Sequence, residues 1–573
     1  MRGFAEAVVS FAVLYRFDIE RSRVSRARIE IEKIRDDLLN AHSFITIFEA
    51  RREAAEWRQD YNEVRPHFAI ERQGNSPSNL KLTNSHSYRL RRTPSQVTTS
   101  SSRSTAIRLT LHKEEAPVRF NRFVSRPLAI AAFALSLVAC NGTGVVTPSA
   151  LGSSPLIQSA HHNVSGGKIQ HIVIVVQENR SLNNLFYGFP GATTATYGYD
   201  SSGAKINLVP IPLEAPWDLE HDSLGFFAAC NGTGSIPGTN CQMNGFNKEE
   251  TGCGSGCPYA HPQYGYVPHS ETKPYFDIGK QYVLADQMYA SNFDADSFIS
   301  HQYIISAQAK QAVDDPFYEP WGCPGGSGDF INMIGQQRQI PDGKEVVCWN
   351  ATTLGDELDK AGIPWAYYAA SYTGTPWIWS AYQAIKHIYY GPDWGKDVIS
   401  PPSQFLTDVS KGQLRAVSWV TPTWTNSDHP NSDSTTGPQW VASLVNAIGE
   451  SKYWDSTAMF IFWDDYGGWY DPEPPAYVDY DGLGMRLPML IVSPYAKKGH
   501  VSHVHYEHGS ILKFVEDVFG LGRLAASDKR ANSPAEDAFD FNKPPRPFKA
   551  IPTVLGKDYF LHQPPDDHLP DNN

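Results

Sequence analysis

The chain has 573 residues, 41% of them hydrophobic, which is enough to bury at least one large core. Its charge is uneven: the first 126 residues carry 23 Lys and Arg against 15 Asp and Glu, and the remainder carries 26 against 46. The remainder is therefore acidic by about 20 charges, which excludes nucleic acid as an expected partner because nucleic-acid-binding faces are basic.

The first 123 residues differ in composition from the rest of the chain. They are rich in Arg and Ser, contain no Cys, and show little hydrophobic periodicity beyond Ser22–Leu39. We expect residues 1–123 to be a spurious or disordered leader, read from upstream of a misplaced start. A genuine helical extension is the alternative, because Ser22–Leu39 has helical spacing.

An apolar run, Pro127–Cys140, follows three arginines. Basic residues, a short apolar stretch and small residues at its end are typical of a signal peptide, here residues 124–140, and the run is too short for a mature membrane span. Its last four residues resemble a bacterial lipobox, which predicts lipid attachment at Cys140. Residues 141–166 have the composition of a tether. We expect an exported bacterial protein, secreted or held at the membrane by a lipid anchor; a buried helix over the apolar run is the alternative.

The first element of the folded portion is a predicted buried strand. Ile169–Gln177 is a nearly continuous run of Val and Ile, typical of a central strand in a parallel sheet covered on both faces. It ends on Glu178 and Asn179. Ligands bind at the carboxyl ends of such strands, and these two side chains offer hard oxygen ligands to a divalent metal.

A Gly-, Cys- and Pro-rich stretch at about 213–274 follows this strand, and we expect it to be an insertion around the site entrance. An even number of cysteines in an exported chain predicts disulfides, without fixing their pairing. The six after Cys140 are Cys230, Cys241, Cys253, Cys257, Cys323 and Cys348. A zinc site that begins at Cys253 and Cys257 is the alternative.

Strands and helices alternate along the rest of the chain. Further strands are predicted at Gln281–Ala285, Trp365–Ala369, Ala416–Thr421, Ala458–Asp464 and Leu487–Ser493. Helices are predicted at Ser300–Ala309, Thr353–Ala361, Gln439–Ser451 and Ser510–Phe519. Strands separated by helices indicate parallel βαβ units. The expected fold is therefore α/β, a three-layer α/β/α sandwich with a mostly parallel sheet.

One of these later strands also ends on carboxylates. The apolar run Ala458–Asp464 is followed by Asp465 and a Gly-Gly turn. With Glu178 and Asn179, the two aspartates predict a shared site for one divalent metal ion of unknown identity. Carboxylates gathered in one coordination sphere repel one another unless a cation is bound.

Four segments, in order, resemble a known family. Gln177–Phe186 resembles the opening motif, and Trp463–Asp471 the acidic motif, of the bacterial phosphoesterase family that contains non-haemolytic phospholipases C and acid phosphatases. Ser418–Pro430 and Arg486–Glu516 also match in order. The resemblance implies an alkaline-phosphatase-like fold, a catalytic domain over residues 167–573, and hydrolysis of phosphate esters of the phospholipase C or acid phosphatase type, with phospholipids among the expected substrates.

The same resemblance implies residue roles. Ser297 aligns with the Ser or Thr that takes the phosphoryl group; an ordinary helix N-cap is the alternative. His221, His387 and His503 match family histidines. His429 lies in a polar loop directly after a predicted strand. Imidazoles at such positions protonate leaving oxygens and orient phosphate oxygens, and a structural, hydrogen-bonded role is the alternative for each.

The chain departs from the phospholipase-like pattern at two positions. Tyr466 and Pro472 stand where many phospholipase-like members carry His, so the acidic motif is nearer to the acid-phosphatase branch. Clusters such as Trp377–Tyr382 favour core packing, with a cleft for acyl chains or choline as the alternative. We expect a metal-dependent phosphoesterase that forms a phosphoserine intermediate. A non-catalytic envelope lipoprotein that binds a phosphorylated or zwitterionic ligand is the alternative function.

Overall fold

The computed structural model describes residues 164–294, 296–317, 320–372, 375–376, 378–432 and 434–566. All of them belong to one compact unit. The predicted leader, the signal peptide with Cys140 and nearly all of the tether lie outside the described residues, so those assignments stay predictions. Within the described part, no helix has the length and apolar character needed to cross a membrane.

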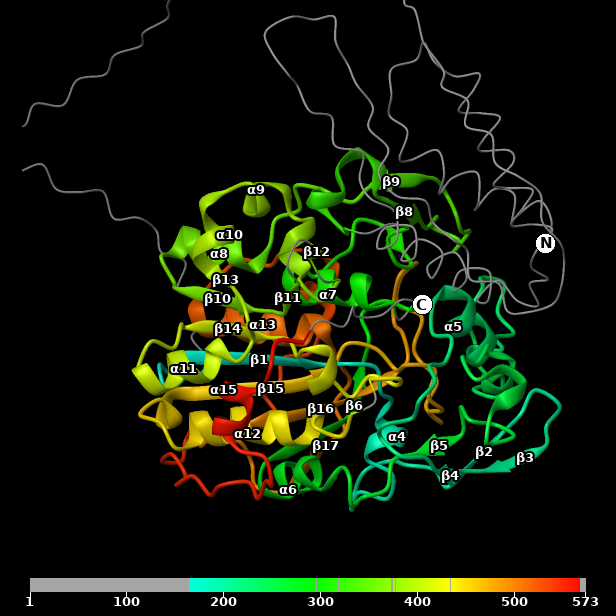
Figure 1. Cartoon of the computed structure of the whole chain (residues 1–573), viewed down its shortest axis with the longest axis horizontal. Helices are drawn as coiled ribbons and strands as arrows, with labels where there is room; N and C mark the ends of the chain where they lie inside the picture. Colours follow the sequence, from blue (N-terminus) through cyan, green and yellow to red (C-terminus); the bar gives the residue numbers. More distant parts are fainter. Residues whose placement is uncertain are drawn as a thin grey trace, which may run out of the picture. The chain divides into compact units, whose positions relative to one another are not determined.

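A nine-stranded sheet forms the centre of the unit, in the order β13-β10-β14-β1-β15-β16-β6-β17, with β18 also paired to β6 (Figure 1). These strands are β1 (His171–Gln177), β6 (Val283–Tyr289), β10 (Trp365–Tyr368), β13 (Val398–Ile399), β14 (Val417–Val420), β15 (Thr457–Trp463), β16 (Arg486–Val492), β17 (His500–Ser502) and β18 (Tyr506–Glu507). Neighbouring strands are parallel except at β16, which is antiparallel to both β15 and β6. The predicted mostly parallel sheet is confirmed.

Helices cover both faces of this sheet. In Figure 1, α7 and α13 lie on one side of the strands, and α6 and α12 lie on the other. The helices are α4 (Leu182–Leu185), α5 (Ser223–Cys230), α6 (Lys273–Gln281), α7 (Ser297–Ser306), α8 (Leu354–Ala361), α9 (Lys386–Tyr389), α10 (Pro392–Asp397), α11 (Gln404–Lys411), α12 (Gly437–Gly449), α13 (His508–Phe519), α14 (Ala526–Arg530) and α15 (Lys557–His562). The three-layer α/β/α fold is therefore confirmed, and it explains why β1 is apolar on both faces.

Local sequence accounts for the ends of several elements. Helix α8 begins after Thr353, whose hydroxyl accepts from the Asp356 backbone N–H in a capping box, and ends at Gly362 in the left-handed region. Strand β16 is antiparallel, unlike the expected βαβ units. Its connection from β15, residues 464–485, contains no helix to carry the chain back along the sheet.

Short sheets and disulfides hold the segments outside the core. The short strands are β2 (Tyr197–Tyr199), β3 (Lys205–Asn207), β4 (Val209–Pro210), β5 (Gly265–Tyr266), β7 (Ala312–Val313), β8 (Phe330–Met333), β9 (Lys344–Val346), β11 (Ser371–Tyr372) and β12 (Thr375–Pro376). The disulfides are Cys230–Cys241, Cys253–Cys257 and Cys323–Cys348. The six predicted cysteines are thus all oxidised, and Cys253 and Cys257 bond to each other rather than begin a zinc site.

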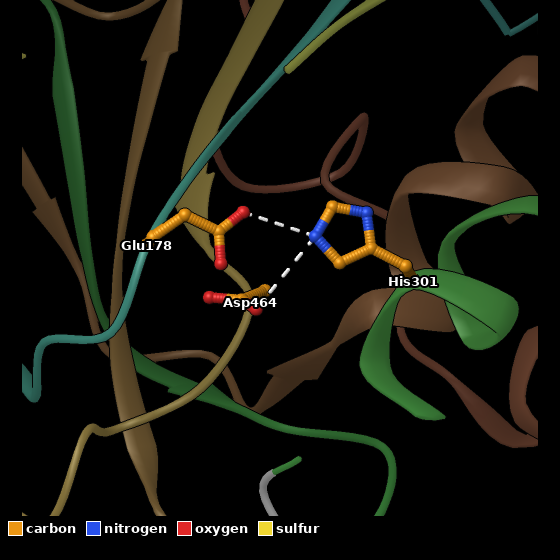
Figure 2. Close-up of side chains that lie close together, drawn as sticks. All are labelled: Glu178, His301 and Asp464. Carbon is orange, nitrogen blue, oxygen red and sulfur yellow. Dashed lines mark hydrogen bonds and ion pairs between the residues drawn. The ribbon is translucent and has the colours of Figure 1, made fainter. Parts of the chain in front are cut away.

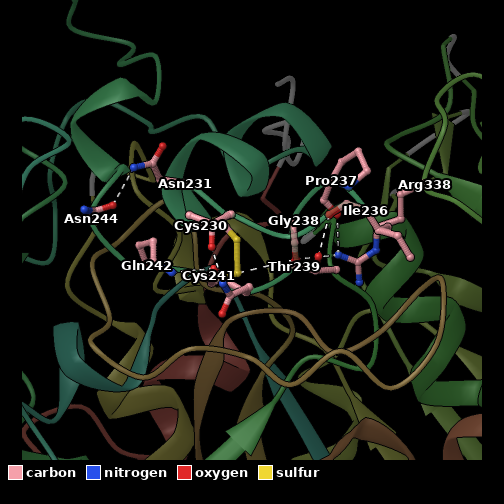
Figure 3. The surroundings of a disulfide bond; sticks show 12 residues. Cys230, Asn231, Ile236, Pro237, Gly238, Thr239, Cys241, Gln242, Asn244 and Arg338 are labelled. Carbon is pink, nitrogen blue, oxygen red and sulfur yellow. Dashed lines mark hydrogen bonds between the residues drawn. A yellow bond between two sulfur atoms is a disulfide. The ribbon is translucent and has the colours of Figure 1, made fainter.

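The loop closed by the first disulfide of the insertion, Cys230–Cys241, is held by a buried arginine. Figure 3 shows Arg338 next to Pro237 and Gly238 of this loop, and it donates to their backbone oxygens at 3.2 and 2.9 Å. The Arg338 guanidinium also lies 4.3 Å from the ring centre of Phe293. These contacts attach the insertion to the main unit.

Candidate active site

The ends of β1 and β15 bring the predicted metal ligands together. Gln177 pairs with Trp463 at the last register position, so Glu178 and Asp464 leave the sheet side by side. Both side chains are fully buried. The turns are tight: Asn179 has a φ of 58°, and a Cβ at Gly467 would stand 2.2 Å from the Asn179 carbonyl oxygen. Only glycine fits at that position.

Ser297 lies at the beginning of α7, directly against Glu178. Its hydroxyl donates to Glu178 Oε2 at 3.3 Å, and its side chain is fully buried. Asp296 occupies the N-cap position, so Ser297 is the first helical residue and the N-cap alternative is wrong. The N-terminal end of a helix favours anions such as phosphate.

His301 completes a group that the sequence did not reveal. One turn after Ser297 on α7, its Nε2 lies 3.0 Å from Glu178 Oε1 and 3.7 Å from Asp464 Oδ2 (Figure 2). The ligand atoms of these three residues all lie within 4.8 Å of one another. The available signal was the four-residue spacing from Ser297, which places both side chains on one helix face.

His221 and His429 reach the site from loops. His221 Nδ1 lies 2.6 Å from the Leu219 carbonyl oxygen, so Nδ1 carries the proton and Nε2 accepts from Asn179 Nδ2 at 2.9 Å. That arrangement leaves Asn179 Oδ1 buried with no hydrogen-bond partner. The rings of His221 and His429 lie 6.3 Å apart, and both are almost fully buried. The insertion therefore contributes to the site through His221.

The donor set fits a divalent cation. Asn179 Oδ1 and Asp464 Oδ2 are buried oxygens that accept no hydrogen bond, and such groups require a partner. Together with Glu178 and His301 they offer the carboxylate, amide and imidazole ligands that divalent metals use. Asp465 shapes the adjoining turn, because its Oδ1 accepts from the Gly467 N–H at 2.7 Å.

The other two predicted histidines lie elsewhere, paired with carboxylates. His387, on α9, is 40% exposed and contacts Asp356 at 2.7 Å. His503 is 59% exposed and contacts the buried Asp286 at 2.8 Å. The structure brings neither of them to the Glu178 group.

Hydrogen bonds made by the buried Arg180 and Asp428 side chains hold the polar loop before His429. Arg180 donates to the backbone oxygens of Asp428 and Leu213, both at 2.7 Å, and burial lowers its pKa to about 10. The Asp428 carboxylate accepts from the hydroxyl of Tyr275 and the indole of Trp463 at 2.6 and 3.0 Å. Burial raises the pKa of Asp428 to about 6. Arg180 thus connects the start of the insertion to the His429 loop.

A second histidine not anticipated from sequence lies behind Asp464. His508, the first residue of α13, is fully buried, and its ring centre is 5.6 Å from that of Phe462. Burial lowers its pKa to about 4, although the Asp464 carboxylate opposes this change. At neutral pH His508 therefore adds no positive charge to the site.

Comparison with known proteins places this geometry in a family. The model of the phosphoesterase family matches residues 169–522. The chain is 23% identical to non-specific phospholipase C1 of Arabidopsis thaliana, over 62% of this chain and 68% of that one. It is 24% identical to phospholipase C B of Mycobacterium tuberculosis, over 66% and 79% of the two chains. The model of the integrase core domain matches residues 27–74, outside the described residues.

Solved structures show more distant likeness. One is a protein in the alkaline phosphatase superfamily from Vibrio parahaemolyticus, with a TM-score of 0.31 and 10% identity, over 64% of this chain and 71% of that one. Another is the lipoteichoic acid synthase LtaP of Listeria monocytogenes, with a TM-score of 0.31 and 8% identity, over 66% and 80% of the two chains.

Proposed function

Because this chain belongs to the phosphoesterase family, it is a hydrolase of phosphoric ester bonds, and we propose that Ser297 is its nucleophile. The observation that carries this proposal is the Ser297 hydroxyl, 3.3 Å from Glu178 Oε2 at the beginning of α7. A carboxylate at this position accepts the hydroxyl proton as the oxygen attacks. The helix terminus and its backbone N–H groups stabilise the phosphoryl oxygens.

The proposed reaction has two displacements. Ser297 Oγ forms a bond to phosphorus as the bond to the ester oxygen breaks, and the departing alcohol takes a proton from an imidazole. Water then gives a proton to the imidazole as its oxygen attacks the phosphorus of the phosphoserine. The bond from phosphorus to Ser297 Oγ breaks, Oγ takes back the proton from Glu178, and phosphate or a phosphomonoester is released. A divalent cation held by Glu178, Asn179, His301 and Asp464 would activate the hydroxyl and offset phosphoryl charge.

We assign the acid role to His429 and an orienting role to His221. His221 fixes the amide of Asn179 through its Nε2 contact at 2.9 Å. His429 belongs to the same buried cluster and lies on the loop that Arg180 supports. His387 and His503 are left out of the proposed mechanism because each pairs with a carboxylate at an exposed position.

The proposed substrates are phosphate esters of the phospholipid type, as the names of the relatives suggest. Export and lipid attachment at Cys140 remain part of the proposal. Three disulfides support an oxidising compartment, because such bonds persist outside the cytosol.

The decisive assay compares p-nitrophenyl phosphate with p-nitrophenyl phosphorylcholine, each with and without a chelator. Hydrolysis that the chelator abolishes and added metal restores supports the proposal and ranks monoester against diester. Tight binding of either compound without turnover would instead favour the non-catalytic ligand-binding lipoprotein.

A further inference from the structure

The structure adds a nitrogen atom to a set of ligands that the sequence presented as oxygen only. We propose that His301 binds the cation through Nε2, that Tyr367 holds the imidazole in the tautomer required for this, and that the nitrogen makes the site prefer Mn²⁺, Fe²⁺ or Zn²⁺ to Mg²⁺ or Ca²⁺. The inference rests on the proposed metal-dependent function and deepens it by naming the class of metal.

The tautomer follows from a chain of hydrogen bonds. Tyr367, fully buried on β10, donates its only hydroxyl proton to the Trp379 backbone oxygen at 2.7 Å. Toward His301 Nδ1, 3.4 Å away, the Tyr367 oxygen is therefore an acceptor, and Nδ1 carries the proton. Nε2, which lies 3.0 Å from Glu178 Oε1, is then the ring nitrogen that a cation would bind on displacing the Nε2 proton. Such a hydrogen bond on the remote ring nitrogen is the usual way that proteins orient a metal-binding histidine.

The surroundings of Nε2 call for a cation. Its neighbours are two fully buried carboxylates, Glu178 at 3.0 Å and Asp464 at 3.7 Å. Nε2 and Glu178 Oε1 form a hydrogen bond, so a proton stands between them, and a divalent cation that replaces this proton would offset the charge of both carboxylates. Asp464 Oδ2 also accepts no hydrogen bond, so it has an acceptor position to offer the same ion.

A nitrogen ligand changes which metal is preferred. Carboxylate and amide oxygens alone suit Mg²⁺ and Ca²⁺, whereas imidazole favours first-row transition ions. Because His301 lies on the same helix face as Ser297, the ion bound by its ring is held next to the hydroxyl that attacks.

Metal binding to the full chain, measured apart from turnover, tests the proposal. Calorimetry with Mn²⁺ and Mg²⁺ gives the preference, and pulsed electron paramagnetic resonance of the Mn²⁺-loaded protein reports directly bound nitrogen. The wild type is expected to bind Mn²⁺ more tightly and to show ¹⁴N coupling. His301→Gln should abolish the coupling and weaken Mn²⁺ binding by about 100-fold, while Mg²⁺ binding changes little.

Two further variants separate ligation from structure. Tyr367→Phe keeps the ring and removes the acceptor, so Mn²⁺ binding should weaken by about tenfold with the ¹⁴N coupling retained. His500→Gln changes a histidine that contacts Asp537 at 2.8 Å outside the site, and should leave both readouts unchanged. If His301→Gln does not fold, the wild-type spectrum and Tyr367→Phe still decide.

Absence of ¹⁴N coupling in the wild type, or equal affinity for Mn²⁺ and Mg²⁺, would overturn the proposal even if the enzyme hydrolyses phosphate esters. Nitrogen coupling without hydrolysis would retain the metal site and reject the proposed function. The two failures are therefore distinguishable.

Discussion

The two ends of the same strands differ in how their polar groups are satisfied. At the amino ends of β1 and β14, a surface pocket is lined by residues that include His171, Asp408 and Arg415. His171 Nδ1 contacts Ser456 Oγ at 3.0 Å, and Asp408 accepts from the Tyr368 hydroxyl at 2.8 Å. At the carboxyl ends, Asn179 Oδ1 and Asp464 Oδ2 are buried without a hydrogen-bond donor.

This contrast separates a surface pocket from the candidate active site. Polar groups that already form hydrogen bonds with one another stabilise the fold and contribute little to ligand binding. Buried groups without a hydrogen-bond partner make binding more favourable, because a ligand supplies the missing interaction. The surface pocket lies at the amino ends, whereas the buried oxygens without a hydrogen-bond partner lie at the carboxyl ends, where ligands bind in open α/β sheets. Variants at the two ends test this distinction.

The largest expected effect is that of Ser297→Ala. Removing the nucleophile should lower turnover by roughly 10⁴-fold or more, because a covalent pathway is lost as a whole. Metal binding should persist, since Glu178, His301 and Asp464 are unchanged. Acid-quenched protein given radiolabelled substrate should contain no phosphoserine. Retention of even a tenth of the wild-type rate would remove Ser297 from the mechanism.

Asp464→Asn is expected to have the next largest effect. Loss of one negative ligand should lower turnover by about 10³-fold, the equivalent of several kcal/mol of charge stabilisation. The free energy of unfolding should change little, because mutual repulsion of the carboxylates also falls. His171→Gln, at the opposite end of the sheet, is the matched control and should keep full turnover. Equal losses of turnover in Asp464→Asn and His171→Gln would contradict the proposed difference between the carboxyl and amino ends of the strands.

His429→Gln should lower turnover by about 100-fold on substrates with alkyl leaving groups, as expected when a general acid is lost. On p-nitrophenyl esters the loss should be smaller, because p-nitrophenolate departs without protonation. Rates measured over a series of leaving groups give the comparison. A loss that is the same for every leaving group would contradict the acid role.

The disulfides should contribute unequally to stability. Their sequence separations are 25 residues for Cys323–Cys348 and 4 for Cys253–Cys257. In the chain-entropy model, replacing both cysteines by Ser should cost about 3.5 kcal/mol at the first pair and about 2 kcal/mol at the second. Urea unfolding measures the difference. Thiol titration of the denatured, unreduced protein should find no free thiol among the six, and six free thiols would refute the bonds.

The last predicted effect is a pH dependence of stability at Asp428. Its pKa in the folded protein, about 6, lies above the unfolded value, so the folded state binds more protons between about pH 4 and 6. The wild type should therefore lose about 3 kcal/mol of stability as pH rises through that window. Asp428→Asn retains an acceptor oxygen and should lose this dependence. Parallel pH curves for the two proteins in urea unfolding would show that the carboxyl does not titrate there.

Much of the sheet was predictable because its strands are continuous apolar runs. The predicted Ala458–Asp464 corresponds to β15, and Trp365–Ala369 to β10, within a residue at each end. The direction of β16 was not predictable from its own residues, since strand direction depends on what connects it to the previous strand. The helix α6 was missed, although Pro274 stands at its beginning.

Sequence alone determined which residues of the ligand type follow buried apolar strands, namely Glu178 and Asp464. It also predicted that they lie close together, because the carboxyl ends of parallel strands meet at one edge of a sheet. Only the tertiary structure decided which histidines join them. His301 reaches the group through helix α7, and His221 reaches it from the insertion, whereas His387 and His503 pair with other carboxylates. A histidine carries no sequence mark of its partner, since its role depends on which charges and oxygens the packed elements bring within hydrogen-bonding distance.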